Sequence, residues 1–113
     1  MALGVMIFVA ETEELSLHAF ETAEAAIAHC EGLDVEAGTW VFWDDNGSPL
    51  EAYFTKPNQR GLFSASNGTY TLVPAGSGHH APLSEALEEI LHFEGRAPFD
   101  SEAGVREHLA RGT

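Results

Sequence analysis

Basic side chains and cysteine are scarce in this sequence. Only 5 Lys and Arg stand against 18 Asp and Glu, which gives a formal net charge of −13 at pH 7. Proteins that bind nucleic acids or anionic membranes attract phosphates with Lys and Arg, so this balance argues against DNA, RNA and membrane partners. Cys30 is the only cysteine, so no disulfide can form within the chain, and we expect a cytoplasmic protein.

Long hydrophobic runs and common catalytic motifs are missing as well. The apolar run at residues 2–10 is too short to span a bilayer and follows no positive charge, which argues against a transmembrane helix and a secretory signal. No nucleophile elbow, phosphate-binding loop, dinucleotide glycine pattern or zinc-type His and Cys spacing occurs. We therefore expect no cofactor and no metal, and we favour a protein that is not an enzyme.

The 113 residues, 44% of them hydrophobic, suffice for a single α+β domain over residues 1–113. Hydrophobic periodicity, caps and turn residues place the elements along the chain. We expect strands at 4–10 and 15–19, a helix capped by Thr22 and ended by Gly32, hairpins turning at Asn46-Gly47 and Asn67-Gly68, a helix at 83–91, and a last helix beginning at Asp100 or Ser101.

This order predicts an antiparallel β-meander of about 4–6 strands, because hairpin-length connections join only antiparallel strands. Two or three helices should pack mainly on one face of the sheet. The helix at 83–91 has an apolar face, and we expect Leu87, Ile90 and Leu91 to pack onto Phe63 and Leu72. In the last helix, Val105 and Leu109 are the inward positions.

The two turns also predict which side chains share a face. A two-residue turn at Asn46-Gly47 sets Trp43 opposite Leu50 and leaves Trp40 and Phe42 on the other face, beside Glu51 and Tyr53. A turn at Asn67-Gly68 sets Ala65 against Tyr70 and Phe63 against Leu72.

The first of these faces is the predicted binding site. Trp and Tyr are preferred anchors of protein interfaces, and acidic side chains at the rim would select a basic partner. The alternative is that a helix or the first strand covers this face and makes the aromatics part of the core. The predicted partner-binding residues are Trp40, Phe42, Asp44, Asp45, Glu51 and Tyr53.

Three other candidates favour a structural interpretation. His79 and His80 could bind a metal, but adjacent side chains seldom converge on one ion. The run from Asp44 to Gly47 superficially matches a calcium loop but has the spacing of a turn. Cys30 could be a nucleophile, yet it lies on the apolar side of its helix near the C-terminal end, and we expect a small buried side chain.

The small size, the acidic balance, the helix before the Trp40–Gly47 hairpin and the final helix resemble the small immunity proteins that bacteria keep beside toxins. The resemblance implies a protein that binds and blocks a basic toxin or nuclease-like domain stoichiometrically. Two other classes stay open. One is a small ligand-binding domain or small-molecule enzyme that uses the sheet face, and the other is a structural or regulatory subunit with a self-complementary apolar face.

Overall fold

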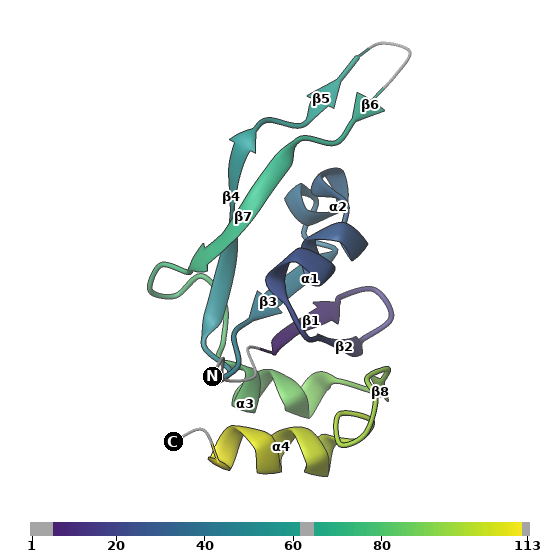
Figure 1. The fold of residues 1–113 in the computed structure, drawn as a ribbon, viewed down its shortest axis with the longest axis vertical. Helices are drawn as coiled ribbons and strands as arrows, with labels where there is room; N and C mark the ends of the chain where they lie inside the picture. The colour runs from purple at the N-terminus through teal and green to yellow at the C-terminus, as the bar shows by residue number, and fades with distance from the viewer. Residues whose placement is uncertain (1–5, 62–64, 112–113) are drawn as a thin grey trace.

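The computed structural model describes residues 6–61 and 65–111, which form a six-stranded, mostly antiparallel sheet with helices around it (Figure 1). The strand order is β7-β4-β3-β1-β2-β8, and β2 pairs with β8 in parallel. The predicted α+β class is confirmed. The strands of this sheet are β1 (Ile7–Glu11), β2 (Ser16–Phe20), β3 (Trp40–Trp43), β4 (Pro49–Lys56), β7 (Thr69–Pro74) and β8 (His92–Phe93).

The central strand β1 is buried on both faces, so the sheet separates two hydrophobic clusters. Ile7 and Val9 point to one side and contact Phe42 and Leu50. Phe8 and Ala10 point to the other side. Side chains alternate along a strand, so a run of four buried residues requires cover on both sides.

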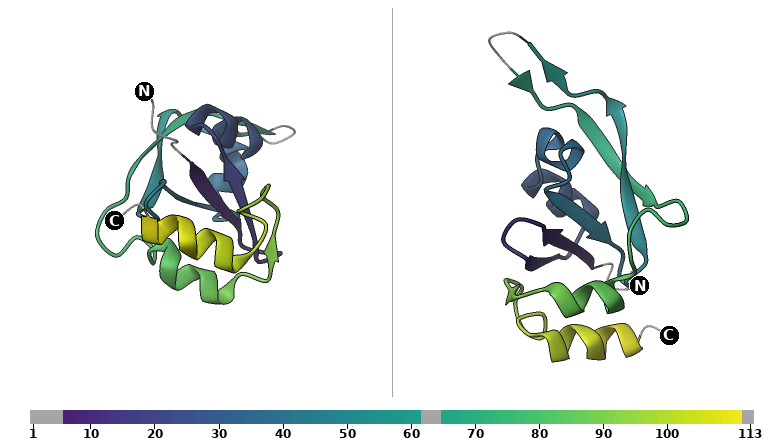
Figure 2. Two further views of the ribbon diagram at one scale, coloured as in Figure 1. Left: turned by 60° about the horizontal axis from the view of Figure 1, so that its bottom comes forward. Right: turned by 180° about the vertical axis from the view of Figure 1, so that it is seen from behind.

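Helices cover both faces of the sheet. The prediction that the helices lie mainly on one face of the sheet is therefore corrected. Helices α1 (Ala23–His29) and α2 (Gly32–Glu36) follow β2 and lie on the side of Ile7 and Val9. Helices α3 (Leu83–Ala86) and α4 (Glu102–Arg111), with the 3-10 turn η1 (Leu87–Glu89), lie on the other side (Figure 2). The sequence pattern showed which residues of each helix are apolar, but it carried no information on which face of the sheet each helix covers.

The start of α1 agrees with the sequence pattern and its end does not. Thr22 accepts a hydrogen bond from the backbone N–H of Ala25 at 3.0 Å, as an N-cap residue does. The helix ends at Cys30, which is extended, so Gly32 does not serve as the C-terminal cap. Gly32 instead begins α2, an element that the sequence analysis did not predict.

The predicted helix at 83–91 is shorter than expected. The backbone becomes extended at Ile90, and the N–H groups of Leu91 and His92 donate to the carbonyl of Leu15. Leu83 and Leu87 are fully buried against Phe8 and Trp43 as members of the second cluster, whereas Leu91 is 67% exposed. The predicted contact with Leu72 is wrong, because Leu72 lies on the opposite face of the sheet, and Phe63 lies outside the described residues.

The final helix follows its prediction. The Ser101 hydroxyl accepts a hydrogen bond from the N–H of Gly104 at 3.1 Å, so Ser101 is the capping residue. Val105 is fully buried and Leu109 packs against the same cluster.

The turn between β3 and β4 has one residue more than predicted. Gly47 has φ of +81°, its N–H donates to the carbonyl of Asp44, and the N–H of Asp44 donates to the carbonyl of Ser48. This is a type I turn followed by a left-handed glycine, the usual three-residue hairpin. Trp43 therefore pairs with Pro49 and Phe42 with Leu50, one residue away from the predicted register.

The second predicted turn is wrong. Strand β7 pairs with β4, and the short strands β5 (Gln59–Arg60) and β6 (Ala65–Ser66) continue this hairpin as an arm that projects beyond α2 (Figure 1). Ala65 pairs with Arg60 and Tyr70 with Phe54, so Asn67-Gly68 is not the turn of this hairpin. A Cβ at position 68 would lie 2.0 Å from the carbonyl oxygen of Lys56. Gly68 therefore allows the backbone of its segment to approach the backbone at Lys56 closely.

Leu87 and Leu91 provide a matched test of the corrected helix. We expect Leu87→Ala to lower the free energy of unfolding by about 2 to 5 kcal/mol, because it leaves a cavity in the second cluster. The same substitution at the exposed Leu91 should change it by less than about 0.5 kcal/mol. Chemical denaturation measures both, and equal losses in the two variants would contradict the assignment.

Candidate functional site

The one-residue change in register separates the predicted binding residues. Trp40 and Phe42 face the cluster that holds Ile7 and Val9, and Phe42 is buried. Leu50, Ala52 and Phe54 share that face with them. Tyr53 and Glu51 alternate with these residues and therefore lie on the opposite face of the sheet. The predicted grouping of Trp40 and Phe42 with Tyr53 and Glu51 is wrong, because a shift of one residue moves every side chain of a strand to the other face.

The acidic side chains of the predicted site form hydrogen bonds within the protein and stabilise its fold. Asp44 accepts hydrogen bonds from the N–H groups of Asn46 and Ser48, both at 2.9 Å, within the turn. Asp45 joins three parts of the chain, because its Oδ1 accepts from the N–H of Met6 and lies 2.9 Å from Nε2 of His108. Glu51 accepts from the N–H of Gly76.

Tyr53 remains available for a partner. Its side chain is 62% exposed on the outer face of β4. Its role in binding stays a prediction.

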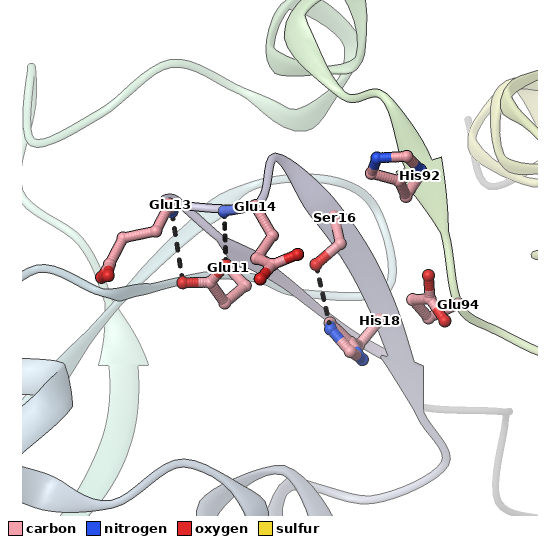
Figure 3. A pocket seen from close by; sticks show the side chains of 7 residues that line it. All are labelled: Glu11, Glu13, Glu14, Ser16, His18, His92 and Glu94. Carbon is pink, nitrogen blue, oxygen red and sulfur yellow. Dashed lines mark hydrogen bonds between the residues drawn. The ribbon is translucent and has the colours of Figure 1, made fainter.

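A different acidic surface lies at the other edge of the sheet, where a groove of about 640 Å³ opens (Figure 3). In this view the carboxylates of Glu14 and Glu94 lie on either side of Ser16 and His18, and Glu13 points away from them. The groove is lined by Glu11, Glu13, Glu14, Ser16, His18, His92 and Glu94.

The turn between β1 and β2 positions the first carboxylates. Glu11 ends β1, and its two carboxylate oxygens accept hydrogen bonds from the N–H groups of Glu13 and Glu14. Leu15 has φ of +56°, an uncommon value for a branched side chain, and completes the reversal. Glu11 therefore fixes the turn, while Glu13 and Glu14 are exposed.

The segment after η1 supplies the opposite wall. β8 pairs in parallel with the start of β2, and the N–H of Glu94 donates to the carbonyl of Leu17 at 2.8 Å. Backbone hydrogen bonds thus hold His92 and Glu94 beside the turn, although about 80 residues of chain separate them from it.

His18 lies between the groove and an aromatic cluster. Burial lowers the pKa of His18, and the nearby imidazole of His29 lowers it further, while Glu94 and Glu11 act in the opposite direction. Behind it, the rings of His29 and Trp40 have centroids 5.6 Å and 5.7 Å from that of His18. Trp40 therefore supports the groove through His18, a role that the sequence pattern did not predict.

The groove contains a Ser and His pair, which raises the question of catalysis. Oγ of Ser16 lies 3.3 Å from Nε2 of His18. A serine nucleophile needs an exposed hydroxyl and a third group that orients the imidazole. Ser16 is buried, and among residues 6–61 and 65–111 no carboxylate forms a hydrogen bond with His18. The Ser16 and His18 pair therefore lacks two features of a catalytic serine.

His79 and His80 converge on each other. Their Nδ1 atoms lie 2.8 Å apart, and Nε2 of His80 lies 2.9 Å from the carbonyl oxygen of Phe42. A carbonyl only accepts, so Nε2 of His80 carries a proton and His79 donates to the remaining nitrogen of His80. Over the described part of the chain, no group of three or more His, Cys, Asp or Glu side chains has an arrangement that could hold a metal ion.

Cys30 is fully buried in the first cluster, as its position predicted. Burial, with a contribution from Asp34, raises the pKa of its thiol to about 12. The thiolate is the reactive form, so this side chain is a structural one.

Comparison with family models, with curated proteins and with solved structures finds no match to this chain. None of the helices among the described residues is long and apolar enough to cross a membrane.

The groove has a sequence signal of its own, separate from the aromatic hairpin. Glu11, Glu13 and Glu14 fall within four residues between two strands, which predicts a turn with clustered carboxylates. Glu94 and His92 could not be added from the sequence, because their place depends on the parallel pairing of β8 with β2.

The lowered pKa of His18 predicts a loss of stability at acidic pH. The folded state favours the neutral imidazole, so its contribution is complete above the unfolded pKa of about 6.5 and is lost as the pH falls through the lower folded value. Between pH 7.5 and pH 5, His18→Gln should therefore lose less unfolding free energy than the wild type. Denaturant titrations measure this difference, with His92→Gln as the control on the groove's opposite wall; a wild-type-like profile in His18→Gln would refute it.

Burial of Cys30 predicts a protected thiol. We expect an aromatic disulfide reagent at pH 8 to react with the native protein far more slowly than with the protein in denaturant, because reaction requires opening of the α1 side of the core. Absorbance of the released thiolate follows the reaction. Native and denatured rates of similar size would contradict the burial of Cys30.

Proposed function

We propose that the protein is a non-enzymatic, acidic protein-binding module whose groove receives basic side chains of a partner. The best candidate is stoichiometric inhibition, of the immunity type, of a basic toxin or nuclease-like domain in the cytoplasm. The observation that supports this proposal is the groove itself: four glutamates and two histidines line it, and no Lys or Arg does among the described residues.

The geometry suits a long cationic side chain. Glu14 and Glu94 flank the groove, so a guanidinium or ammonium group between them would meet carboxylate oxygens from both sides (Figure 3). Charge-assisted hydrogen bonds of this kind are about twice as strong as neutral ones, and a guanidinium can bind a carboxylate with two parallel bonds.

The turn that carries the glutamates is already ordered without a partner. Glu11 fixes the backbone at Glu13 and Glu14, and the N–H of Thr12 donates to the carbonyl of Thr39 on the neighbouring segment. A site whose backbone is already fixed loses less conformational entropy when a partner binds, and this raises the affinity.

The charge of the whole chain adds a long-range effect. The first 55 residues contain eleven acidic side chains, from Glu11 to Glu51, and no Lys or Arg. One wall of the groove, from Glu11 to His18, belongs to this part, so its negative field should accelerate the approach of a basic protein.

A small ligand is the second candidate, and one further cavity favours it. Strands β3 and β4 pair only at Phe42 and Trp43, and a cavity of about 250 Å³ opens where they diverge, lined by Trp40, Phe54, His79 and His80 among others. This volume lies just below the usual range for ligand sites, so only a small molecule would fit. A thermal-shift screen that finds a small molecule stabilising the protein, with the shift abolished by substitution of His80, would favour this alternative.

Removal of three groove charges provides the direct test. The partner is first isolated by affinity capture at low salt and then purified. Glu13→Gln, Glu14→Gln and Glu94→Gln together should lower the association rate by about tenfold at low ionic strength, because they remove the charges that guide the encounter. Stopped-flow measurements across ionic strengths record this rate.

The matched control removes the same number of charges elsewhere. Glu24, Glu85 and Glu88 are exposed and lie outside the groove, so their triple Gln variant keeps the same net charge as the groove variant. We expect a smaller effect from it, since local charges at the binding site matter most. Equal effects of the two triple variants would rule out the groove as the contact site.

A further inference from the structure

Strand β7 forms an open edge of the sheet. It has six residues, Thr69–Pro74, and among the described residues it pairs only with β4. The opposite edge is β8, which has two residues. An edge strand of this length presents a row of unpaired backbone groups that can receive another strand.

The pairing with β4 determines which backbone groups face outward. The N–H of Ala75 donates to the carbonyl of Pro49, which makes these two residues a hydrogen-bonded pair. Hydrogen-bonded and non-hydrogen-bonded pairs alternate along an antiparallel ladder. Val73 and Thr71 therefore bond to β4, whereas the N–H and C=O groups of Tyr70 and Leu72 point away from it.

The edge lacks the features that usually prevent strand pairing. Natural edges are protected by charged side chains, by a proline inside the strand, or by being short. Strand β7 contains no charged residue, and its one proline, Pro74, is its last residue.

The chain around β7 also differs in charge from the rest of the molecule. Residues 52–84 contain no Asp or Glu, and Lys56 and Arg60 are their only charged residues. All 18 acidic residues lie outside this segment. From Ala52 onward, the β4–β7 hairpin and its arm thus belong to a segment with two basic residues and no acidic one, in a strongly acidic protein.

We propose that a second copy of this chain pairs with β7, through antiparallel β7 strands related by a twofold axis at Thr71. Tyr70 of each copy then lies opposite Leu72 of the other, and the outward N–H groups of both residues find carbonyl partners. Pro74, whose ring replaces an N–H, lies opposite Gly68 of the other copy, which has no side chain to obstruct it.

A second copy fits this edge because β7 is complementary to itself: the outward N–H and C=O groups of Tyr70 and Leu72 lie symmetrically about Thr71. Although each chain carries a net charge of −13, Thr69–Pro74 contains no charged side chain, so no like charges oppose each other across the two pairing strands. The groove lies at the opposite edge of the sheet, beside β2 and β8, so the dimer and the proposed function do not depend on each other.

Sedimentation velocity on the full chain tests the proposal, over concentrations from about 10 µM to about 1 mM. The wild type should show a concentration-dependent dimer. Thr71→Lys places two ammonium groups opposite each other at the axis and should raise the dissociation constant about tenfold or more. The control, Ala103→Lys, adds the same charge to an exposed position on α4, outside β4 and β7, and should dimerise like the wild type. Circular dichroism and thermal melting confirm that both variants fold.

A disulfide trap tests the position of the axis. Residues directly opposite in a non-hydrogen-bonded pair have Cα atoms about 4.5 Å apart, which a disulfide can span. Thr71→Cys should form a covalent dimer under mild oxidation, Thr55→Cys should not, and the buried Cys30 does not compete. A wild type that stays monomeric at every concentration, or a Thr71→Lys variant that dimerises like the wild type, would overturn the proposal.

Discussion

The burial of β1 on both faces is the constraint on which the rest of the structure depends. Phe8 and Val9 are adjacent and both fully buried, so each face of the sheet must have its own hydrophobic layer. The chain supplies α1 and α2 on one side and α3 and α4 on the other. Asp45 links these parts, since it binds the N–H of Met6 before β1 and the imidazole of His108 in α4. An acidic side chain that the sequence assigned to a partner thus holds the C-terminal helix against the central strand.

How far the sequence predicts this fold depends on the range of the interactions. Local signals succeeded: Thr22 and Ser101 cap their helices, the strand predicted at 4–10 is found as the buried strand Ile7–Glu11, and Cys30 is buried. Gly47 shows where such signals fail, because Asn46-Gly47 fits a two-residue and a three-residue turn equally well, and only the structure reveals the left-handed glycine of the longer turn. That one residue reverses the faces of β4 relative to the prediction and separates Tyr53 from Phe42. The second wall of the groove was beyond prediction, because His92 and Glu94 reach it through the pairing of β8 with β2, a contact between segments far apart in the sequence.

Charge is distributed along the molecule in a way that gives its two sheet edges different properties. The edge formed by β2 and β8 carries the glutamate groove, in which carboxylates flank His18 and no cation is found among the described lining residues. The edge formed by β7 is uncharged and belongs to the segment without acidic residues. One edge is therefore suited to attract a basic protein from a distance, and the other is suited to backbone pairing at short range. The two proposals rest on these separate surfaces.

Amide hydrogen exchange of the protein, alone and saturated with its purified partner, tests the central claim most directly, because it locates the contact without any substitution. Our account predicts that the partner slows exchange at residues 11–18 and 91–94, on both walls of the groove, and leaves β4 and β7 unchanged. Protection confined to β4 and β7, where Tyr53 is exposed, would contradict it and place the partner on the opposite edge of the sheet.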